Sequence, residues 1–276
     1  MRIRVVDAFT DRPFSGNPAG VCLLDQIAWP SETWMRQVAS EMNLSETAFA
    51  HPLLSHEDAD WALRWFTPLV ETNLCGHATL ATAHVLYSDA SMKGPIRFST
   101  RSGVLVANVQ SDGSITLDFP SAIPQELPIP DGLASALGAT PDATYATGTL
   151  GDVLVLFADE AIIRGLSPDY RALAELIRRN DLRGVIVTAA AKEPDAGYDY
   201  ASRYFAPADG IPEDPVTGSA HTALAPYWSA RLGRSALVGL QASTRMGFVR
   251  TELHGDRVYL NGRAVTVLDG SLLPRP

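Results

Sequence analysis

Short apolar runs bounded by turn-forming residues predict a chain built mostly from β-strands. Many of these runs are about four to eight residues long and rich in valine, leucine and aromatic residues, as strands are. Ser111-Asp112-Gly113, between two of the runs, is typical of a hairpin turn. The expected strands are 3–8, 19–24, 61–66, 104–110 and 114–119 in the first half, and 153–158, 184–189, 198–205, 248–253, 258–260 and 264–268 in the second. Residues 43–50 are expected to turn from a helix into a further strand.

Four other stretches predict helices. A helix capped by Ser31 is expected to run to about Met42, and residues 169–180 are its counterpart in the second half. A third helix, 76–87, is apolar nearly all round, which indicates a helix buried in the middle of a domain. The fourth begins at Gly218 and is rich in alanine, and Pro226 is expected to break or kink it.

The two halves of the chain resemble each other. Residues 64–68 (RWFTP) correspond to 203–207 (RYFAP), residues 76–81 to 218–223, and residues 99–103 (STRSG) to 243–247 (STRMG). The matched segments keep their order and lie about 140 residues apart, which indicates an internal duplication.

The duplication and the element pattern together predict an α+β fold. We expect two similar domains related by a pseudo-twofold axis, each a curved, mostly antiparallel sheet around a central helix. The first domain is predicted at 1–119 and the second at 128–263, with the proline-rich stretch 120–130 as a linker.

Composition narrows the class of protein. The net charge of −9 and the absence of a basic run argue against a nucleic-acid partner. The N-terminal apolar run carries Arg4 and Asp7, so no signal sequence is predicted, and no apolar stretch is long enough to predict a membrane span. Two cysteines, Cys22 and Cys75, give no disulfide framework. A cytoplasmic protein is the expectation.

The candidate chemistry lies where the two central helices begin. The first helix start carries Cys75, Gly76 and His77, and the second carries Asp214, Gly218 and Ser219. Helix N-termini bind anions through their unpaired backbone N–H groups, and glycine permits close approach. We therefore expect a small carboxylate-bearing substrate in a cleft between the domains.

The sequence lacks the motifs that are typical of metal sites and of several other kinds of catalytic site. His77, His84 and His221 have no compact metal-ligand spacing and no evident carboxylate partner, so no metal site is predicted; His84 is expected to be structural. No nucleophile elbow, phosphate-binding loop or dinucleotide fingerprint occurs.

Four motifs carry a resemblance to a known family. VDAFTDRPFSGNPAGV, NLSETAF, LCGHATLATAHVL and EDPVTGSAHTALAPYW occur in this order and cover nearly the whole chain. Together they resemble the phenazine-biosynthesis PhzF-like family of isomerases, which has the diaminopimelate epimerase-like fold. The resemblance implies two domains with the active site between them, no cofactor, a homodimer, and a C-terminal strand, 264–276, that returns to the first domain.

The resemblance also implies roles for particular residues. Glu46 matches the glutamate that shuttles the proton, and Asp214 matches a second catalytic aspartate. The residues that match substrate-binding positions are Asn17, Gly76, His77, Gly218 and Ser219. Partial burial of Glu46 after an apolar turn would suit its carboxylate to proton transfer.

Some positions depart from the phenazine enzyme, which leaves the substrate open. Epimerases of this fold use two cysteines; Cys75 occupies the first position, but Pro215 occupies the second and cannot carry a proton. The two-cysteine mechanism is therefore excluded. The predicted function is a cofactor-independent isomerase acting by general acid–base proton transfer. An epimerase or lyase using the same glutamate, and a non-catalytic small-molecule-binding protein, are the alternatives.

Overall fold

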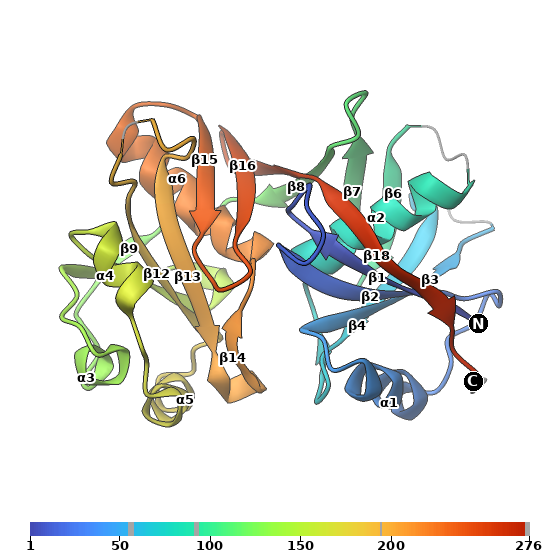
Figure 1. Cartoon of the computed structure of the whole chain (residues 1–276), viewed down its shortest axis with the longest axis horizontal. Coiled ribbons are helices and arrows are strands. Elements are labelled where there is room, and N and C mark those ends of the chain that lie inside the picture. The colour runs from blue at the N-terminus through green and yellow to red at the C-terminus, as the bar shows by residue number, and fades with distance from the viewer. Residues whose placement is uncertain (55–57, 91–93, 194, 274–276) are drawn as a thin grey trace. The chain divides into compact units, whose positions relative to one another are not determined.

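A computed structural model describes residues 1–54, 58–90, 94–193 and 195–273 (Figure 1). The chain divides into two compact units. Unit 1 contains Met1–Phe119 and Asn261–Pro276, and unit 2 contains Pro120–Leu260. Residues 274–276, at the end of the predicted returning segment, lie outside the described residues.

The sheet of unit 1 mixes parallel and antiparallel pairs. From one edge the strands run β18, β1, β2, β3, β4, β6, β7 and β8, with β5 also paired to β4. The β2–β3 and β4–β6 pairs are parallel and the others antiparallel. The strands are β1 (Arg2–Ala8), β2 (Asn17–Leu23), β3 (Glu46–Pro52), β4 (Trp61–Phe66), β5 (Glu71–Thr72), β6 (Ile96–Thr100), β7 (Gly103–Val109), β8 (Ile115–Pro120) and β18 (Ala264–Ser271).

Helix α2 (Gly76–Ala90) is enclosed by this sheet. It contacts β1, β2, β3, β7 and β18, so strands far apart in the sheet pack against one helix. Its buried positions fall on all sides, as the apolar composition of the segment predicts. Alanines at 78, 81 and 83 leave room for the strands to approach closely, and Leu80, Val85 and Leu86 fill the space between them.

A second helix, α1 (Glu32–Met42), adds another layer to unit 1. Ser31 caps it by accepting a hydrogen bond from Trp34 N at 3.2 Å. Its buried residues are Met35, Val38 and Ala39, which pack with Phe49 and Phe66. Asn43 ends the helix in a left-handed conformation (φ 49°), which turns the chain toward β3.

Strand β18 pairs antiparallel with β1 and lies beside it in Figure 1 (dark red against blue). The pairing is reinforced on one face, where Arg2 and Arg4 both donate to the carboxylate of Asp269. The hydrogen bonds from Arg2 and Arg4, together with the positive charges of both side chains, lower the pKa of Asp269 to about 2. The segment after residue 260 therefore completes the sheet of unit 1.

Unit 2 contains a second mixed sheet. Its strands pair in the order β9, β10, β11, β12, β13, and then β13 with both β14 and β15, and β15 with β16. These strands are β9 (Gln125–Leu127), β10 (Ala143–Ala146), β11 (Asp152–Leu156), β12 (Gly184–Ala190), β13 (Tyr200–Ala206), β14 (Ile211–Asp214), β15 (Ala236–Gln241) and β16 (Gly247–His254). The unit boundary falls within β17 (Arg257–Gly262).

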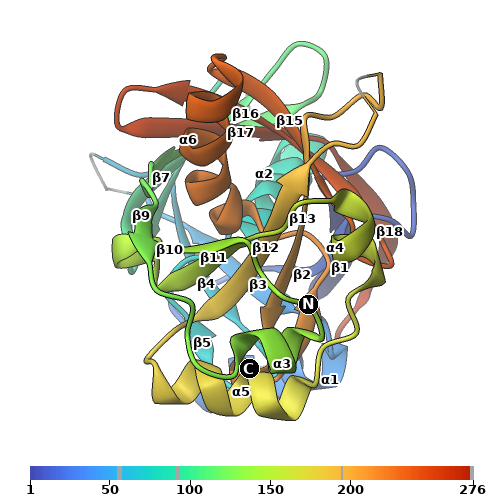
Figure 2. The same ribbon diagram turned by 90° about the vertical axis from the view of Figure 1, so that its left-hand side faces the viewer.

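Helices cover both faces of this sheet (Figure 2). On one face lies α6 (His221–Leu232), and on the other lie α3 (Leu133–Leu137), α4 (Glu160–Gly165) and α5 (Tyr170–Arg179). Side chains of β12 alternate between them: Val185 and Val187 pack toward α3–α5 and Ile186 toward α6. Because both faces are covered, β11 and β12 are apolar at nearly every position rather than at every second one.

A break or kink is expected at Pro226, but helix α6 continues through this residue, so the prediction of a break is wrong. Proline has no N–H to donate to the carbonyl four residues earlier, which is that of Thr222. Ala122 N donates to this carbonyl instead, at 3.0 Å. The helix is thus maintained because the segment before β9 supplies the missing donor.

The predicted fold class is confirmed: the chain is α+β, with long mixed sheets and few helices. The predicted starts of the two central helices, at Gly76 and at Gly218, are confirmed. The second begins as a 3₁₀ turn (Gly218–Ala220) that leads into α6. The sequence prediction missed several short elements, and β9 lies inside the stretch expected to be a linker. The missed elements are β5, β6, β9, β10, β14, β15, α3 and α4.

In the described part of the chain, no helix is both long and apolar enough to cross a lipid bilayer.

Candidate active site

Two strand starts in unit 1 place Glu46 and Asn17. Glu46 is the first residue of β3, immediately after the turn that ends α1, and Asn17 is the first residue of β2. Parallel pairing of β2 with β3 puts Ala19 opposite Glu46, which brings the two strand starts to the same end of the sheet. Asn17 is fully buried, and the Glu46 side chain is 12% exposed.

The start of α2 places Cys75 and His77 at this end of the sheet. The carbonyl of Cys75 accepts hydrogen bonds from Thr79 N at 3.2 Å and from Thr79 Oγ1 at 2.6 Å, which fixes the first turn. Both Cys75 and His77 are buried. The positive end of the helix dipole therefore lies beside the thiol and the imidazole.

His77 is the centre of a four-residue cluster. Its Nε2 lies 3.3 Å from Glu46 Oε2, while its Nδ1 lies 3.2 Å from Asn17 Nδ2 and 3.5 Å from Cys75 Sγ. With Asn17 donating to Nδ1, the neutral ring carries its proton on Nε2, the nitrogen that lies beside the Glu46 carboxylate. The imidazole thus contacts a carboxylate that is mostly buried but not sealed from solvent.

The prediction that no carboxylate lies beside the histidines is wrong for His77. The fold brings Glu46, Cys75 and His77 within 4.8 Å of one another through their ligand-type atoms. The three histidines themselves do not form a group. His84 Nε2 instead contacts Thr266 Oγ1 of β18 at 3.1 Å, which agrees with a structural role.

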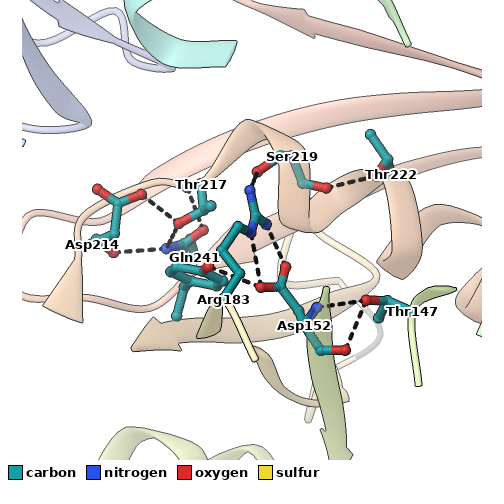
Figure 3. Close-up of polar contacts among 9 residues, drawn as sticks. Thr147, Asp152, Arg183, Asp214, Thr217, Ser219, Thr222 and Gln241 are labelled. Carbon is teal, nitrogen blue, oxygen red and sulfur yellow. Dashed lines mark hydrogen bonds and ion pairs between the residues drawn. The ribbon is translucent and has the colours of Figure 1, made fainter. Parts of the chain in front are cut away.

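In unit 2, Asp214 ends β14, and Gly218 and Ser219 follow in the segment that leads to α6. Figure 3 shows Asp214 and Ser219 with their polar contacts. Thr217 Oγ1 donates to Asp214 Oδ2 at 2.5 Å. Gln241, the last residue of β15, donates through Nε2 to Asp214 O at 2.8 Å and accepts from Thr217 N at 2.8 Å. These bonds hold the loop against the sheet, so the Asp214 carboxylate has a defined orientation.

An ion pair between Arg183 and the fully buried Asp152 fixes Ser219. Arg183 Nη1 donates to Ser219 Oγ at 3.0 Å, and the same guanidinium forms a two-pronged ion pair with Asp152 (Figure 3). Tyr204 adds a hydrogen bond to Asp152 Oδ1 at 3.0 Å. Since the arginine occupies an acceptor position of Ser219, the hydroxyl proton of Ser219 is available as a donor. The arrangement suits recognition of an anionic group.

His221 begins α6 behind this loop and is completely buried. Tyr200 Oη lies 2.9 Å from His221 Nδ1, and burial raises the pKa of Tyr200, so the phenol donates to a neutral imidazole. Burial lowers the pKa of His221 to about 3. His221 is therefore a structural residue of the core and not a ligand.

Replacing His221 by glutamine is expected to change how stability depends on pH. Between about pH 6.5 and pH 3, the unfolded chain binds a proton at His221 and the folded chain does not. The free energy of unfolding should therefore fall as pH drops below 6.5, by about 1.4 kcal/mol per pH unit from this group. His221→Gln should remove that contribution in urea unfolding at pH 7, 6 and 5. Equal slopes in variant and wild type would contradict the assignment, and exposed His254→Gln is the control.

The family model for phenazine biosynthesis-like proteins matches residues 6–270. The chain belongs to the phenazine biosynthesis-like family. An uncharacterized isomerase of Halalkalibacterium halodurans is 46% identical over 274 residues, covering 98% of each chain. A phenazine biosynthesis PhzF family protein of Enterococcus faecalis superposes with a TM-score of 0.86 at 39% identity, covering 98% of this chain and 97% of that one.

A more distant structure shares the fold alone. A hydroxyproline epimerase of Agrobacterium vitis, bound to trans-4-hydroxy-L-proline, is 13% identical with a TM-score of 0.61, covering 98% of this chain and 91% of that one. Together with the names of the closer relatives, the family membership supports an isomerase-type activity in general terms.

The structure groups the predicted residues by unit and adds several that the prediction missed. Asn17, Gly76, His77 and Glu46 lie together in unit 1, and Asp214, Gly218 and Ser219 lie together in unit 2. Arg183, Asp152, Tyr204 and Gln241 were missed. Parallel pairing of β11 with β12, which sets Asp152 opposite Gly184, brings Asp152 beside Arg183, and no local sequence pattern indicates this pairing.

Proposed function

We propose that this protein is an isomerase that moves a proton within a small carboxylate-bearing metabolite. The observation that carries the proposal is the contact of the Glu46 carboxylate with His77 at the start of a buried helix. Family membership supports it at the level of isomerase chemistry.

Glu46 is the base of the proposed reaction. It takes a proton from a carbon next to an activating group, and the conjugate acid returns the proton to another atom of the same molecule, so one residue does both steps. His77 keeps the carboxylate oriented between the two transfers, and Asn17 holds the ring. The side chains named here supply the acid–base chemistry, and the reaction as proposed needs no cofactor.

The proposed substrate carries a carboxylate. Ser219, oriented by Arg183, and the backbone of Gly218 offer hydrogen-bond donors at the start of α6. Asp214 is proposed as the second polar group that acts on the substrate. Joint action of the two units on one substrate, and the homodimer, stay predictions from the sequence and its resemblance.

Solvent deuterium exchange tests the proposed function. Cyclic carboxylates and amino acids are incubated with the enzyme in deuterium oxide, and incorporation at carbon is followed by mass spectrometry and NMR. A substrate should gain deuterium with wild type, and the gain should collapse with Glu46→Gln. Binding of a compound without any exchange would favour the alternative of a binding protein.

The same experiment separates the enzyme alternatives. Deuterium at a new position with a shifted double bond indicates an isomerase, whereas deuterium at an inverted stereocentre indicates an epimerase. Loss of a group from the labelled compound indicates a lyase.

A further inference from the structure

We propose that Glu46, Cys75 and His77 form a binding site for a single zinc ion, and that zinc bound there reversibly blocks the proton-transfer group. The site lies wholly in unit 1, and its three donors come from the start of β3 and the start of α2. This inference goes beyond the proposed isomerase, which needs no metal.

The donor set suits zinc. A thiolate, an imidazole nitrogen and a carboxylate oxygen are the three side-chain ligands that protein zinc sites use. The soft thiolate disfavours magnesium and calcium, which prefer oxygen ligands alone. Three protein ligands with one remaining position is also the composition of an open zinc site.

The distances are close to those of a bound ion. Two ligands of one tetrahedral zinc ion lie about 3.3–3.8 Å apart at ordinary bond lengths. Here His77 Nε2 lies 3.3 Å from Glu46 Oε2, within this range, whereas Cys75 Sγ lies 3.5 Å from the other ring nitrogen, Nδ1. Because the three ligand atoms all lie within 4.8 Å of one another, shifts of about 1 Å would bring them into tetrahedral contact.

His77 can bind the ion through one ring nitrogen while its other ring nitrogen is hydrogen-bonded. Zinc on Nε2, the nitrogen beside Glu46, leaves Nδ1 facing the buried side-chain amide of Asn17. Histidines that bind zinc usually hydrogen-bond through the second nitrogen in this way, which fixes the ring. With zinc on Nε2, Nδ1 carries the ring proton, and the Asn17 amide turns over so that Oδ1 replaces Nδ2 as the partner of Nδ1.

Binding exchanges a proton for the ion. The Cys75 thiol loses its proton to the buffer as the zinc–sulfur bond forms, so zinc affinity should decrease as pH is lowered. Glu46 then donates an electron pair to the metal and can no longer accept a proton from a substrate. Removal of zinc by a chelator restores the free carboxylate.

Zinc titration of the full-length protein tests the proposal without any substrate. Chelator-treated protein competes with a chromophoric chelator for zinc, and one ion per chain should bind. Changes to outer-shell partners alone weaken metal sites by about 10–100-fold, so Cys75→Ala, which removes a ligand, should weaken binding by at least about 100-fold. Cys22→Ala is the matched control, because Cys22 is buried and burial raises its thiol pKa to about 12.

Cobalt gives a spectroscopic signature of the ligands. Cobalt in place of zinc should show a thiolate-to-metal charge-transfer band and tetrahedral d–d bands, and both should vanish in Cys75→Ala. The competing zinc site is at the surface, on His254, whose Nε2 lies 2.9 Å from Glu252 Oε1. Zinc binding that survives Cys75→Ala, lacks the charge-transfer band, or is lost in His254→Gln would overturn the proposal. Deuterium exchange by the metal-free protein is measured independently, so failure of the zinc proposal leaves the proposed isomerase function intact.

Discussion

Glu46→Gln should lower turnover by roughly 10²–10⁴-fold, the contribution usually made by a positioned acid–base group. Glutamine keeps the shape of the side chain and can still contact His77, so substrate affinity should change little. The measurement is the steady-state rate and the rate of deuterium incorporation with the substrate that the exchange screen identifies. A loss in the rate constant without a matching rise in KM is the expected pattern.

Cys75→Ala is the comparison variant for this prediction. It removes the thiol beside His77 Nδ1 but leaves the contact of Nε2 with Glu46. Its effect on turnover should be far smaller than that of Glu46→Gln. Turnover near the wild-type rate in Glu46→Gln, or an equally large loss in Cys75→Ala, would show that the base is another residue.

Arg183→Met should cost about 3–5 kcal/mol of the free energy of unfolding, the range found when one partner of a buried ion pair is removed. The substitution leaves the Asp152 carboxylate, whose side chain is fully buried, without its cation. Asp152→Asn should cost less, about 1–3 kcal/mol. The reason is that the Arg183 side chain is 30% exposed and can be hydrated, while Tyr204 can still donate to the amide oxygen.

Urea unfolding of both single variants and the double variant measures this asymmetry. The double variant should lose less than the sum of the two single losses, because the second change removes a charge that the first left unpaired. The exposed pair Arg171–Glu175 on α5, with a 3.4 Å contact, is the control, and Arg171→Met should cost less than about 1 kcal/mol. A loss larger in Asp152→Asn than in Arg183→Met would contradict the account of the ion pair.

The long elements of the fold could be predicted from the sequence because each carries its own local signal. The helix at Gly76 was predictable because it is apolar on all sides, and the Ser31 cap marks the start of α1. Short elements such as β9 and β14 have no such signal, since strands of three and four residues are too short to show an alternating pattern. The continuity of α6 at Pro226 depends on Ala122, a donor about 100 residues away, and no local pattern reports it.

In the candidate site, too, the residues could be predicted from the sequence but their contacts could not. Motifs around Glu46, His77, Asp214 and Ser219 identify the residues through family resemblance. What they contact depends on register: Glu46 reaches His77 only because β3 starts beside β2 and α2 starts at the same end of the sheet. The closeness of Cys75 to both was therefore not predictable, and neither was the ion pair behind Ser219.

The pairing of β18 with β1 affects the order in which the chain can be completed during translation. Residues 264–271 are synthesised only after all of unit 2, whereas β9 to β16 of unit 2 come from one uninterrupted stretch. The N-terminal unit, although made first, is therefore the second to be completed. Until β18 emerges from the ribosome, one edge of β1 has no partner, and an open strand edge of this kind can pair with other nascent chains.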